Sequence, residues 1–546
     1  MIANRVDRPA VELNGVILTG FDGPLCGHLL LSTSFIPSSP HTPAHVMFLQ
    51  HLIYSSTEVH LCMVYLVILS CCPILTAATY VGPDAVRTYP IPSGVETMDA
   101  YSIKVTPPQG SSHWIQPFQA RVAQINETSG NSIEHNTSVG LFDFSGPIAI
   151  AITYHHAAVR TGVVRPYSYG IRPQIINNTI QFSLQHPCNL VIQINDNIFD
   201  TLQLFMNPIE TKVTRADDPD VLYFGPGLNN GTAGIMNGTL HVPSGKTVYV
   251  AGGGFLDAQV VFQNVSNSAI KGRGILAAKS SGAVLIESSS NITVEDVVIL
   301  NPNGYAVTAG MSQGVNILGI RAFSSKGNGD GIDLFCCRDA LIDGIFMRNS
   351  DDNIALYQHR WAYYGDSSNI TVQNSALWAD YAHPINVGTH GNTPHPEVMD
   401  GVTIRNIDIL NHHEPQIGYQ GCIAINAGDG NLIQNVHIED IRVEDFQLGQ
   451  LVNFRVMYNT KYNTSPGRGI RNVVVKDLIY EGNHASPSLL LGYDRQRPIT
   501  NITFVNLQIN GKMIDNNMEK PSWYSSADFV PLFANEHVHN LSFVSN

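Results

Sequence analysis

One short pattern recurs along the second half of the chain, and it restricts the possible folds more than any other feature. In each copy apolar residues alternate with polar ones before Asp, Asn or Gly, as in Gly314-Val-Asn-Ile-Leu-Gly-Ile320. The nine copies are spaced 24, 23, 25, 30, 32, 34, 37 and 29 residues apart. They begin at Asn267, Asn291, Gly314, Asp339, Asn369, Gly401, Asn435, Asn472 and Asn501, and a truncated tenth copy begins at Asn540.

A repeat with one short alternating strand and an Asn or Gly at its bend is typical of a parallel β-helix. A propeller blade needs about four strands per copy, and leucine-rich repeats need a leucine framework that this chain lacks. We therefore predict an all-β protein in which residues 208–546 form a right-handed parallel β-helix of about ten coils. The wider spacing of the later copies predicts loop insertions on one face, which in solenoids is often the binding face.

Residues 79–207 carry a different pattern of short alternating strands separated by turn residues. Examples are residues 101–106, 148–153, 179–184 and 189–194. Strands at this close spacing predict an antiparallel β-sandwich before the β-helix. Nothing in this part suggests catalysis, and we interpret the pair His155 and His156 as an edge of the sandwich without function.

The composition excludes some partners. Charged residues make up 14% of the chain and its net charge is −14. Nucleic acids and anionic membranes both require a basic face, so we expect neither as a partner. We also expect the protein to be a monomer.

An apolar run over residues 63–78 ends in small residues, which predicts a secretory signal peptide cleaved after Ala78. It is too short, and broken too soon by Pro73, to span a bilayer comfortably. We interpret residues 1–62 as an unstructured or spurious extension and expect a secreted, extracellular glycoprotein that has no membrane contact after cleavage. Sequons of the form N-x-[ST] occur at Asn126, Asn136, Asn177, Asn230, Asn237, Asn264, Asn291, Asn369, Asn463, Asn501 and Asn540.

Four of the eight cysteines follow the predicted cleavage site: Cys188, Cys336, Cys337 and Cys422. One or two disulfides are possible, but this number is too small for a disulfide scaffold in so long a chain. Neither a CxxC motif nor a Cys/His cluster is present, so we expect no structural zinc site.

The strongest chemical signal lies in residues 326–356. Asp330 is followed 21 residues later by Asp351 and then Asp352, with an alternating apolar segment between them. Because these acids fall just beyond the first strand of adjacent coils, they are predicted to share one patch of a groove. Carboxylates that close cannot all ionise freely, so one pKa must rise. A protonated acid beside an ionised base is what glycosidic bond hydrolysis requires.

Two other interpretations of these acids remain open. Clustered carboxylates also bind Ca²⁺, and Asp residues at coil corners often do no more than cap turns. Three acids that meet in one place, in a chain with few charges, favour a catalytic function.

Three motifs of this region resemble those of the polygalacturonase family, glycoside hydrolase family 28. They are Asn328-Gly-Asp-Gly-Ile-Asp333, Ser350-Asp-Asp-Asn353 and Gly388-Thr-His-Gly391, where the family has N-T-D-G, D-D and G-H-G. The run Asp351-Asp-Asn-Ile-Ala-Leu-Tyr357 is also similar to family 49, the dextranases and isopullulanases, which likewise place a β-sandwich before the β-helix. The resemblance covers residues from about 80 to the end and is strongest over 320–450.

The resemblance implies an inverting glycoside hydrolase that needs no cofactor or metal. Asp351 matches the general acid, and Asp330 and Asp352 match the acids that hold the nucleophilic water. His390 matches the histidine that supports protonation of the acid, although its motif carries an extra residue. The family 28 Arg-x-Lys that grips galacturonate is not recognisable after His390, and Arg455 is a possible substitute. The expected substrate is a polysaccharide, either pectin-type polygalacturonan or an α-glucan such as dextran.

Aromatic and histidine side chains near these motifs are candidates for lining the cleft, because aromatic rings stack on sugar faces. The alternative is that they are buried inside the coils. We place Trp378 and His383 first, and the further candidates are Tyr357, His359, Trp361 and Tyr419.

Inversion predicts that acid and base stand about 6.5–9.5 Å apart. We expect Asp330 and Asp351 to reach this separation by leaning apart across a strand spacing of about 4.8 Å, and the side chains of Asp351 and Asp352 to diverge. A polysaccharide lyase is the alternative enzyme, which would need Ca²⁺-binding acids and an Arg or Lys base. A non-catalytic glycan-binding β-helix is the third possibility, and it leaves the acids unexplained.

Overall fold

The computed structural model describes residues 85–126, 131–211, 214–231, 234–279, 281–519 and 530–545. These residues belong to one unit that runs from Tyr80 to Asn546. The predicted signal peptide and the extension before it lie outside the described residues and stay predictions. Besides strands, these ranges contain two 3₁₀ turns, η1 (Tyr167–Tyr169) and η2 (Ile417–Tyr419). No helix in the described ranges is long and apolar enough to cross a membrane.

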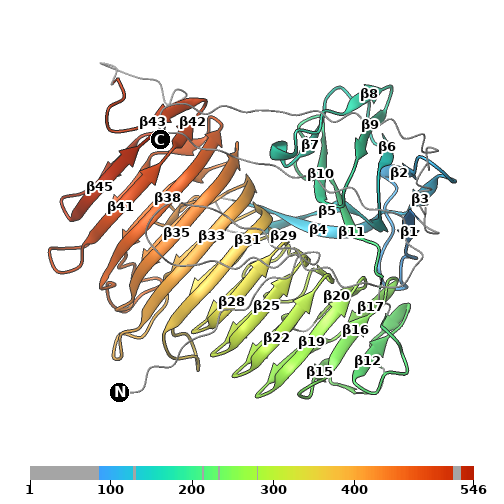
Figure 1. Cartoon of the computed structure of the whole chain (residues 1–546), viewed down its shortest axis with the longest axis horizontal. Helices are drawn as coiled ribbons and strands as arrows, with labels where there is room; N and C mark the ends of the chain where they lie inside the picture. Colours follow the sequence, from blue (N-terminus) through green and yellow to red (C-terminus); the bar gives the residue numbers. More distant parts are fainter. Residues whose placement is uncertain are drawn as a thin grey trace, which may run out of the picture. The chain divides into compact units, whose positions relative to one another are not determined.

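Two sheets that share one apolar core precede the repeats (Figure 1). All four strands predicted for this part are present. One pairing differs from a purely antiparallel sandwich, because β11 runs parallel to β5. The six-stranded sheet contains β1 (Val86–Thr88), β4 (Phe118–Ile125), β5 (Ser132–Phe144), β7 (Gly162–Arg165), β10 (Asn189–Ile194) and β11 (Leu202–Pro208). The five-stranded sheet contains β2 (Tyr101–Thr106), β3 (His113–Ile115), β6 (Ile148–Tyr154), β8 (Gln174–Ile176) and β9 (Thr179–Leu184).

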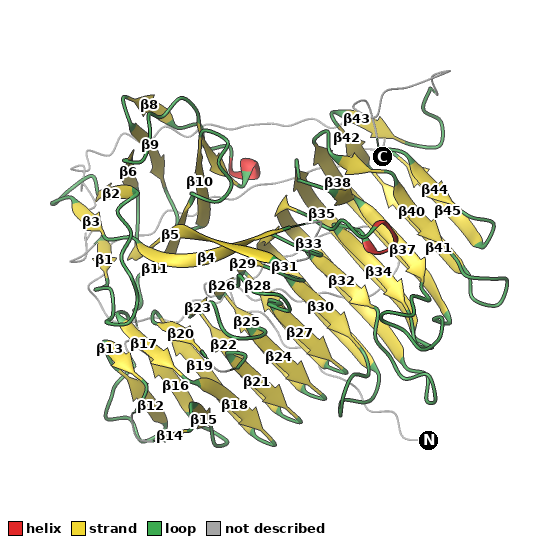
Figure 2. Cartoon of the chain, turned by 180° about the vertical axis from the view of Figure 1, so that it is seen from behind, coloured by secondary structure: helices red, strands yellow, loops and turns green. Residues whose placement is uncertain are grey.

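From β12 onward successive coils add strands to two long sheets, which Figure 2 shows from behind. Pairing between coils is parallel, so the predicted parallel β-helix is confirmed. The 20-stranded sheet contains β12 (Val221–Phe224), β13 (Gly227–Asn229), β16 (Thr247–Val250), β17 (Gly254–Asp257), β19 (Ser266–Gly272), β20 (Ile275–Ala277), β22 (Ser290–Glu295), β23 (Val298–Leu300), β25 (Gln313–Leu318), β26 (Arg321–Phe323), β28 (Arg338–Asp343), β29 (Phe346–Asn349), β31 (Ser367–Ala379), β33 (Val398–Asn411), β35 (Leu432–Glu444), β38 (Gly469–Glu481), β41 (Ile499–Val505), β42 (Leu507–Ile509), β43 (Lys512–Ile514) and β45 (Val538–Val544).

The second long sheet has 12 strands and contributes the third side of each coil. Its strands are β14 (Ile235–Met236), β15 (Thr239–His241), β18 (Gln259–Gln263), β21 (Val284–Glu287), β24 (Val307–Gly310), β27 (Ile332–Phe335), β30 (Ile354–Tyr357), β32 (Ile385–Gly388), β34 (Ile423–Ala427), β37 (Val452–Val456), β40 (Ser488–Leu491) and β44 (Leu532–Ala534). A two-stranded sheet joins β36 (Gly449–Gln450) and β39 (Ala485–Ser486).

The repeat copies follow from a bend that each coil makes at the same place. Their first residues all adopt positive φ, between 53° and 77°. Asn, Asp and Gly tolerate this left-handed conformation best, which explains why they begin every copy. The side chains also form a ladder between coils: Asn291 Nδ2 donates to Asn267 Oδ1 at 2.7 Å, and Asn472 Nδ2 donates to Asn435 Oδ1 at 2.9 Å.

Alternation within each copy directs apolar side chains into the coil. Ile292 and Val294 on β22 are buried, and they pair in register with Val315 and Ile317 on β25. Burying one such side chain contributes about 1.5–3 kcal/mol. The stacked apolar columns therefore stabilise the β-helix, and the ladder fixes where each coil bends.

The structure describes two features that bear on secretion, the sequon asparagines and the cysteines. The sequon residues Asn291, Asn369, Asn501 and Asn540 belong to the ladder, and Asn463 is buried with its side-chain amide donating to the Thr389 carbonyl. The cysteines of the described ranges, Cys188, Cys336, Cys337 and Cys422, are free thiols.

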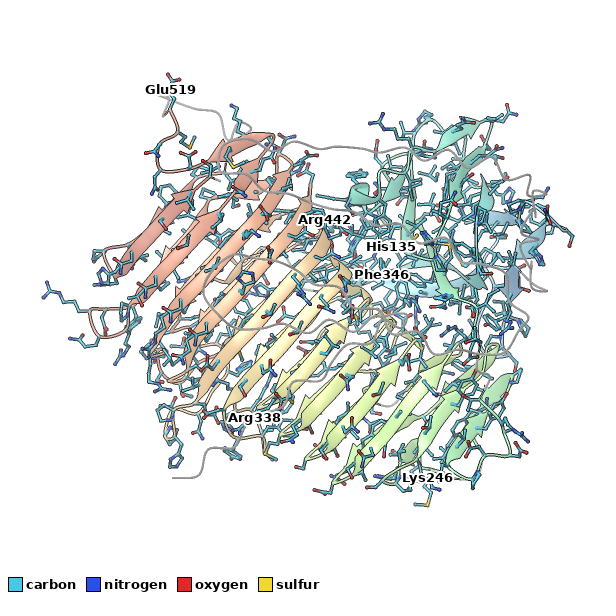
Figure 3. The ribbon with its side chains drawn as sticks, viewed as in Figure 1. His135, Lys246, Arg338, Phe346, Arg442 and Glu519 are labelled. Carbon is cyan, nitrogen blue, oxygen red and sulfur yellow. The ribbon has the colours of Figure 1, made fainter. Side chains whose placement is uncertain are left out.

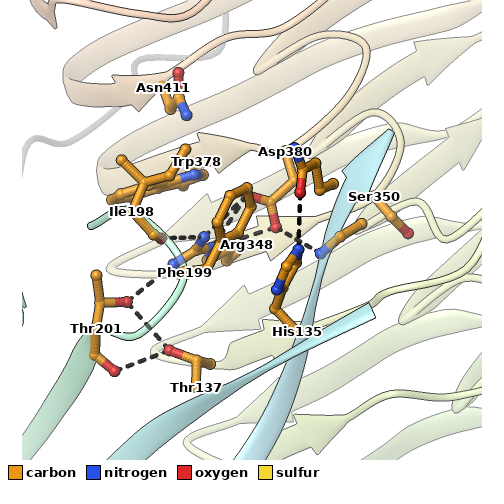
Figure 4. A network of polar contacts seen from close by, with 12 residues as sticks. His135, Thr137, Ile198, Phe199, Thr201, Arg348, Ser350, Trp378, Asp380 and Asn411 are labelled. Carbon is orange, nitrogen blue, oxygen red and sulfur yellow. Dashed lines mark hydrogen bonds and ion pairs between the residues drawn. The ribbon is translucent and has the colours of Figure 1, made fainter. Parts of the chain in front are cut away.

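The sandwich is attached to the β-helix through a buried arginine on β29. Arg348 binds Asp380 at 3.1 and 3.2 Å within the β-helix (Figure 4). It also donates to the Ile198 carbonyl at 2.7 Å and to Thr201 Oγ1 at 3.1 Å, both in the sandwich. The guanidinium lies 4.1 Å from the centre of the Trp378 ring.

Apolar contacts at the same junction come from β29 as well. Phe346 packs against Phe205 of the sandwich with ring centres 5.1 Å apart. Figure 3 shows Phe346 near the sandwich, whereas Arg338, at the start of the same coil, lies far from it and is exposed.

We expect the Arg348→Met variant to lose about 3–5 kcal/mol of unfolding free energy, because Asp380 would be left buried without its cation. Arg338→Met is the matched control, since Arg338 is exposed. Urea unfolding of the two variants measures the difference. Equal stability of both variants would show that the buried pair does not hold the junction.

Candidate active site

The three predicted acids lie in the same turn of consecutive coils. Asp330 stands between β26 and β27, and Asp351 and Asp352 stand between β29 and β30. Ile332 pairs with Ile354, so two positions earlier Asp330 stands beside Asp352. The next coil continues the column with His383, whose carbonyl accepts from the Asn353 N–H at 2.8 Å.

Glycine allows these turns to approach so closely. The N–H of Gly331 donates to the Asp352 carbonyl at 2.8 Å. A Cβ at position 331 would lie 2.3 Å from the Asn353 carbonyl oxygen, a distance no side chain tolerates. The glycine of the first motif, Gly331, therefore allows its coil to pack closely against the coil that carries Asp351 and Asp352.

One carboxylate oxygen from each of Asp330, Asp351 and Asp352 lies within 4.8 Å of the others. The predicted meeting of the three acids is confirmed. The prediction that acid and base stand about 6.5–9.5 Å apart concerns the carboxyl groups rather than their nearest oxygens, and it stays a prediction. Asp330 and Asp352 occupy register-aligned positions, and Asp351 and Asp352 lie in the turn between β29 and β30.

Asp352 is surrounded by donors. Its Oδ1 accepts from the backbone N–H of His383 at 3.0 Å and from His383 Nδ1 at 2.6 Å. Its Oδ2 accepts from the Tyr357 hydroxyl at 2.8 Å and from Asn386 Nδ2 at 2.9 Å. Burial alone would raise the pKa of Asp352, but the His383 charge and these hydrogen bonds outweigh burial and lower it. Asp352 is therefore ionised.

His383 is the counter-ion of Asp352. Its Nε2 faces the Tyr419 carbonyl while Nδ1 faces the carboxylate, so both ring nitrogens meet acceptors and carry protons. Burial opposes the charge, but Asp352 overcomes it and raises the pKa of His383 to about 9. His383 is fully buried, so it positions Asp352 and does not line the cleft as predicted.

The other two acids have the opposite environment. Burial, and then the charge of Asp352, raise the pKa of Asp351 to about 7. The pKa of Asp330 is also raised well above its usual range, by burial and then by Asp333, Asp351 and Asp352. Asp330 Oδ1 has no hydrogen-bond partner among the described residues. The cluster thus contains one ionised carboxylate, Asp352, beside Asp351, whose pKa lies near neutrality, and Asp330, whose pKa is raised.

Two neighbours of the cluster were not predicted from the sequence. Asp333 is fully buried, neither of its oxygens has a partner among the described residues, and burial followed by Asp352 raises its pKa. Its presence in the first motif was a signal that could have been used. Asn386 lies in the same outward row, because Asp333 pairs with Ala355 and Ala355 with Asn386. A lone Asn carries no signal of this kind.

Of the remaining predicted site residues, Tyr357 and His390 lie at the acids, whereas Trp378 is buried in the fold. Tyr357 contacts Asp352, and the half-buried His390 meets the Tyr357 ring edge-on at 5.1 Å. Burial, followed by Arg360, lowers the pKa of His390 to about 4, so the ring is neutral. Trp378 was expected to line the cleft, which is wrong: it is fully buried between Arg348 and Arg165 at the sandwich junction.

The other aromatic candidates and Arg455 surround the site less directly. The Tyr419 hydroxyl accepts from Asn386, and its ring stacks on Tyr462. His359 stacks on Tyr364, and Trp361 is 56% exposed. Arg455 lies in the same outward row as Gly388 and Asn426. Its guanidinium donates to the Gly418 carbonyl.

A second cation near the acids, besides His383, is Arg360, which the sequence did not single out. Its charge opposes the raised pKa of both Asp330 and Asp333. The guanidinium lies 4.6 Å from the centre of the Trp361 ring. Its side chain makes no ion pair or hydrogen bond to another described residue.

A model of the family described as glycosyl hydrolases family 28 matches residues 241–524, which is more than half of the 546 residues. The chain belongs to this family. A polygalacturonase from Chamaecyparis obtusa is 31% identical over 111 residues, which are 20% of this chain and 20% of that protein. The chain therefore matches about a fifth of that relative's length.

Among solved structures, Dex49A from Penicillium minioluteum matches with a TM-score of 0.55 at 13% identity, over 84% of this chain and 96% of that one. An exopolygalacturonase from Thermotoga maritima matches with a TM-score of 0.44 at 16% identity, over 54% of this chain and 85% of that one. The likeness to Dex49A shows that this family 28 chain shares its fold.

The raised pKa of Asp351 predicts a pH-dependent gain in stability for Asp351→Asn. The pKa is 3.8 without the fold and about 7 within it. The folded state therefore loses stability as pH rises between these values, by up to about 4 kcal/mol. Asparagine avoids this loss, and its side-chain oxygen can still accept from the Asp352 N–H.

Urea unfolding at pH 4 and pH 8 tests this expectation. The stability of Asp351→Asn relative to the unmodified protein should increase at the higher pH. The matched control is Asp339→Asn at an exposed ladder position, where Asn stands in most other copies. A gain that is the same at both pH values would contradict the burial of Asp351 in this electrostatic environment.

Proposed function

We propose that this family 28 protein hydrolyses glycosidic bonds of a polysaccharide, with Asp351 as general acid and Asp330 and Asp352 holding the attacking water. One observation carries the proposal: Asp352 is kept ionised by four donors, while Asp351 beside it retains its proton to about pH 7. Environments that push neighbouring carboxyl groups apart in pKa supply both the acid and the base of this reaction.

In the proposed reaction, Asp351 gives its proton to the glycosidic oxygen as the bond from that oxygen to the anomeric carbon breaks. A water oxygen bonds to the anomeric carbon, and its proton passes to the Asp330–Asp352 pair. Asp330 Oδ1, which has no partner among the described residues, is available to that water. Asp352 already accepts four hydrogen bonds, so it supplies mainly negative charge. Solvent then returns one proton to Asp351 and takes one from the pair.

Inversion at the anomeric carbon is proposed from the family resemblance. What favours inversion is the third acid, because two carboxylates can hold a water that a retaining mechanism would not need at this step. Proton NMR of the first-formed product distinguishes the two outcomes.

We expect Asp351→Asn to lose about 10²–10⁴-fold in kcat with little change in fold, because an amide cannot donate the proton. Release of reducing ends from polygalacturonan and dextran measures activity, and Asp339→Asn is the control. Full activity of Asp351→Asn, or a product with retained configuration, would refute the proposed mechanism.

A polysaccharide lyase is the second candidate, and two observations favour it. The three acid oxygens within 4.8 Å could hold Ca²⁺, and Arg360 could act as the base that the sequence motifs lack. The same assay separates the two: a lyase would give an unsaturated, ultraviolet-absorbing product and lose activity with EDTA. Hydrolysis predicts neither effect.

The substrate is proposed as polygalacturonan or an α-glucan. The similarity to a polygalacturonase supports the first. The coil after His390 presents Ala424 and Asn426 outward on β34, so it offers no cation where the resemblance expects Arg-x-Lys. Arg360 is the candidate that would replace it. Faster hydrolysis of dextran than of polygalacturonan would exclude a carboxylate-gripping role for Arg360.

We also propose that the protein is secreted, on the evidence of the apolar run before Ala78. N-terminal sequencing of protein exported by a eukaryotic host should begin at Thr79. Exported protein that retains residues 1–62 would contradict this.

A further inference from the structure

The sandwich has a basin on the exposed face of its five-stranded sheet, with a volume of about 680 Å³. This lies within the range of about 300–1,000 Å³ that is usual for ligand sites. The strand register lines up one row across the face: Trp114, Lys104, Ala151, Gln181 and Gln174. Because strands lie about 4.8 Å apart, this row extends over about 20 Å.

The hollow results from small residues in the middle strand. Ala151 lies between Lys104 and Gln181, and Ala149 lies between Thr106 and Ser183 in the next row. The small alanine side chains therefore form the bottom of the basin, and the longer side chains of Lys104 and Gln181 flank it. Tyr169 at the end of η1 and Arg172 in the segment after it line one side of the basin.

Four long polar side chains of the basin are not used by the fold. The side chains of Lys104, Arg172, Gln174 and Gln181 make no hydrogen bond or ion pair with another described residue. By contrast, polar side chains on the outer face of the β-helix bond between coils, as Gln373 does with Asp343 at 2.9 Å. The basin thus presents amide and cationic donors that are available to a ligand.

The charge of the basin is opposite to that of the protein. Lys104 and Arg172 line it and no Asp or Glu does, although the chain carries a net charge of −14. A local cationic patch on an acidic protein attracts an anion that the rest of the surface repels. Guanidinium and ammonium groups both bind carboxylates.

Exposed aromatic rings frame the same face. Trp114 is 66% exposed at one end of the row, and Tyr169 is 46% exposed on the side that it lines with Arg172. Lys104 Nζ lies 6.0 Å from the centre of the Trp114 ring. Large exposed aromatic rings beside free hydrogen-bond donors suit sugar rings, which have apolar faces and polar edges.

We propose that this basin is a second, non-catalytic site that binds an anionic polysaccharide, a chain of uronic acid residues. Lys104 and Arg172 bind its carboxylates, Gln174 and Gln181 bind its hydroxyl groups, and the aromatic rings contact its sugar faces. The inference goes beyond the proposed hydrolysis and does not depend on the reaction at the three acids.

The test compares the full chain with a Lys104→Gln/Arg172→Gln double variant. Both carry Asp351→Asn, so that cleavage does not disturb the binding measurement. Binding to polygalacturonate, dextran and polyglutamate is followed by isothermal titration calorimetry. Arg160→Gln is the matched control, because Arg160 is an exposed sandwich arginine that does not line the basin. Thermal unfolding checks that all variants fold.

We expect the double variant to raise the Kd for polygalacturonate about tenfold or more, since each lost charge-assisted contact weakens binding. Arg160→Gln should leave the Kd unchanged. An unchanged Kd in the double variant overturns the proposal, and so does an equal loss of dextran binding, because the ligand would then not be anionic. Polyglutamate binding that depends equally on both residues would also overturn it, in favour of a general anion patch.

The binding test of the basin and the activity test of the proposed function can succeed or fail independently of each other. Release of reducing ends by the protein with Asp351 intact tests catalysis, and it is measured on short oligosaccharides that do not reach both sites. Loss of polymer binding with normal oligosaccharide hydrolysis supports the basin alone.

Discussion

The backbone register between neighbouring coils is the constraint on which the site depends. Ile332 pairs with Ile354, and Ile354 with Ile385. These pairs stack Asp330, Asp352 and His383 in one column two positions earlier. A shift by one residue would turn the column away from the site, because side chains alternate between the two faces of a strand. The buried apolar columns and the Asn ladder maintain this register.

The same packing creates the electrostatics. Burial raises the pKa of Asp330, Asp333 and Asp351, while four donors, one of them the buried imidazolium of His383, keep Asp352 ionised. Keeping these carboxyl groups close costs stability, and the cost is present only above the pH at which they would ionise. The rest of the β-helix must offset it through apolar burial. The site is therefore a strained centre in an otherwise regular fold.

The sandwich adds a second set of constraints. Arg348 joins the β-helix to the sandwich. It binds Asp380 in the β-helix and Ile198 and Thr201 in the sandwich, and it stacks on Trp378. Asp351 and Asp352 follow closely after the same strand, β29. Attachment of the sandwich and placement of the acids are thus linked through a few residues of backbone.

The coils, their bends and the meeting of the three acids follow from the amino-acid sequence alone, because the repeat period is a local property of the chain. Tertiary structure decided what depends on register and burial. It placed Asp352, not Asp351, beside Asp330, and it brought in Asn386 from strand β32 and Arg360 from the loop after β30, and neither residue belongs to a motif. It also buried Trp378 at the junction. Side-chain surroundings depend on neighbours in adjacent coils and in the sandwich, and no pattern within one copy encodes them.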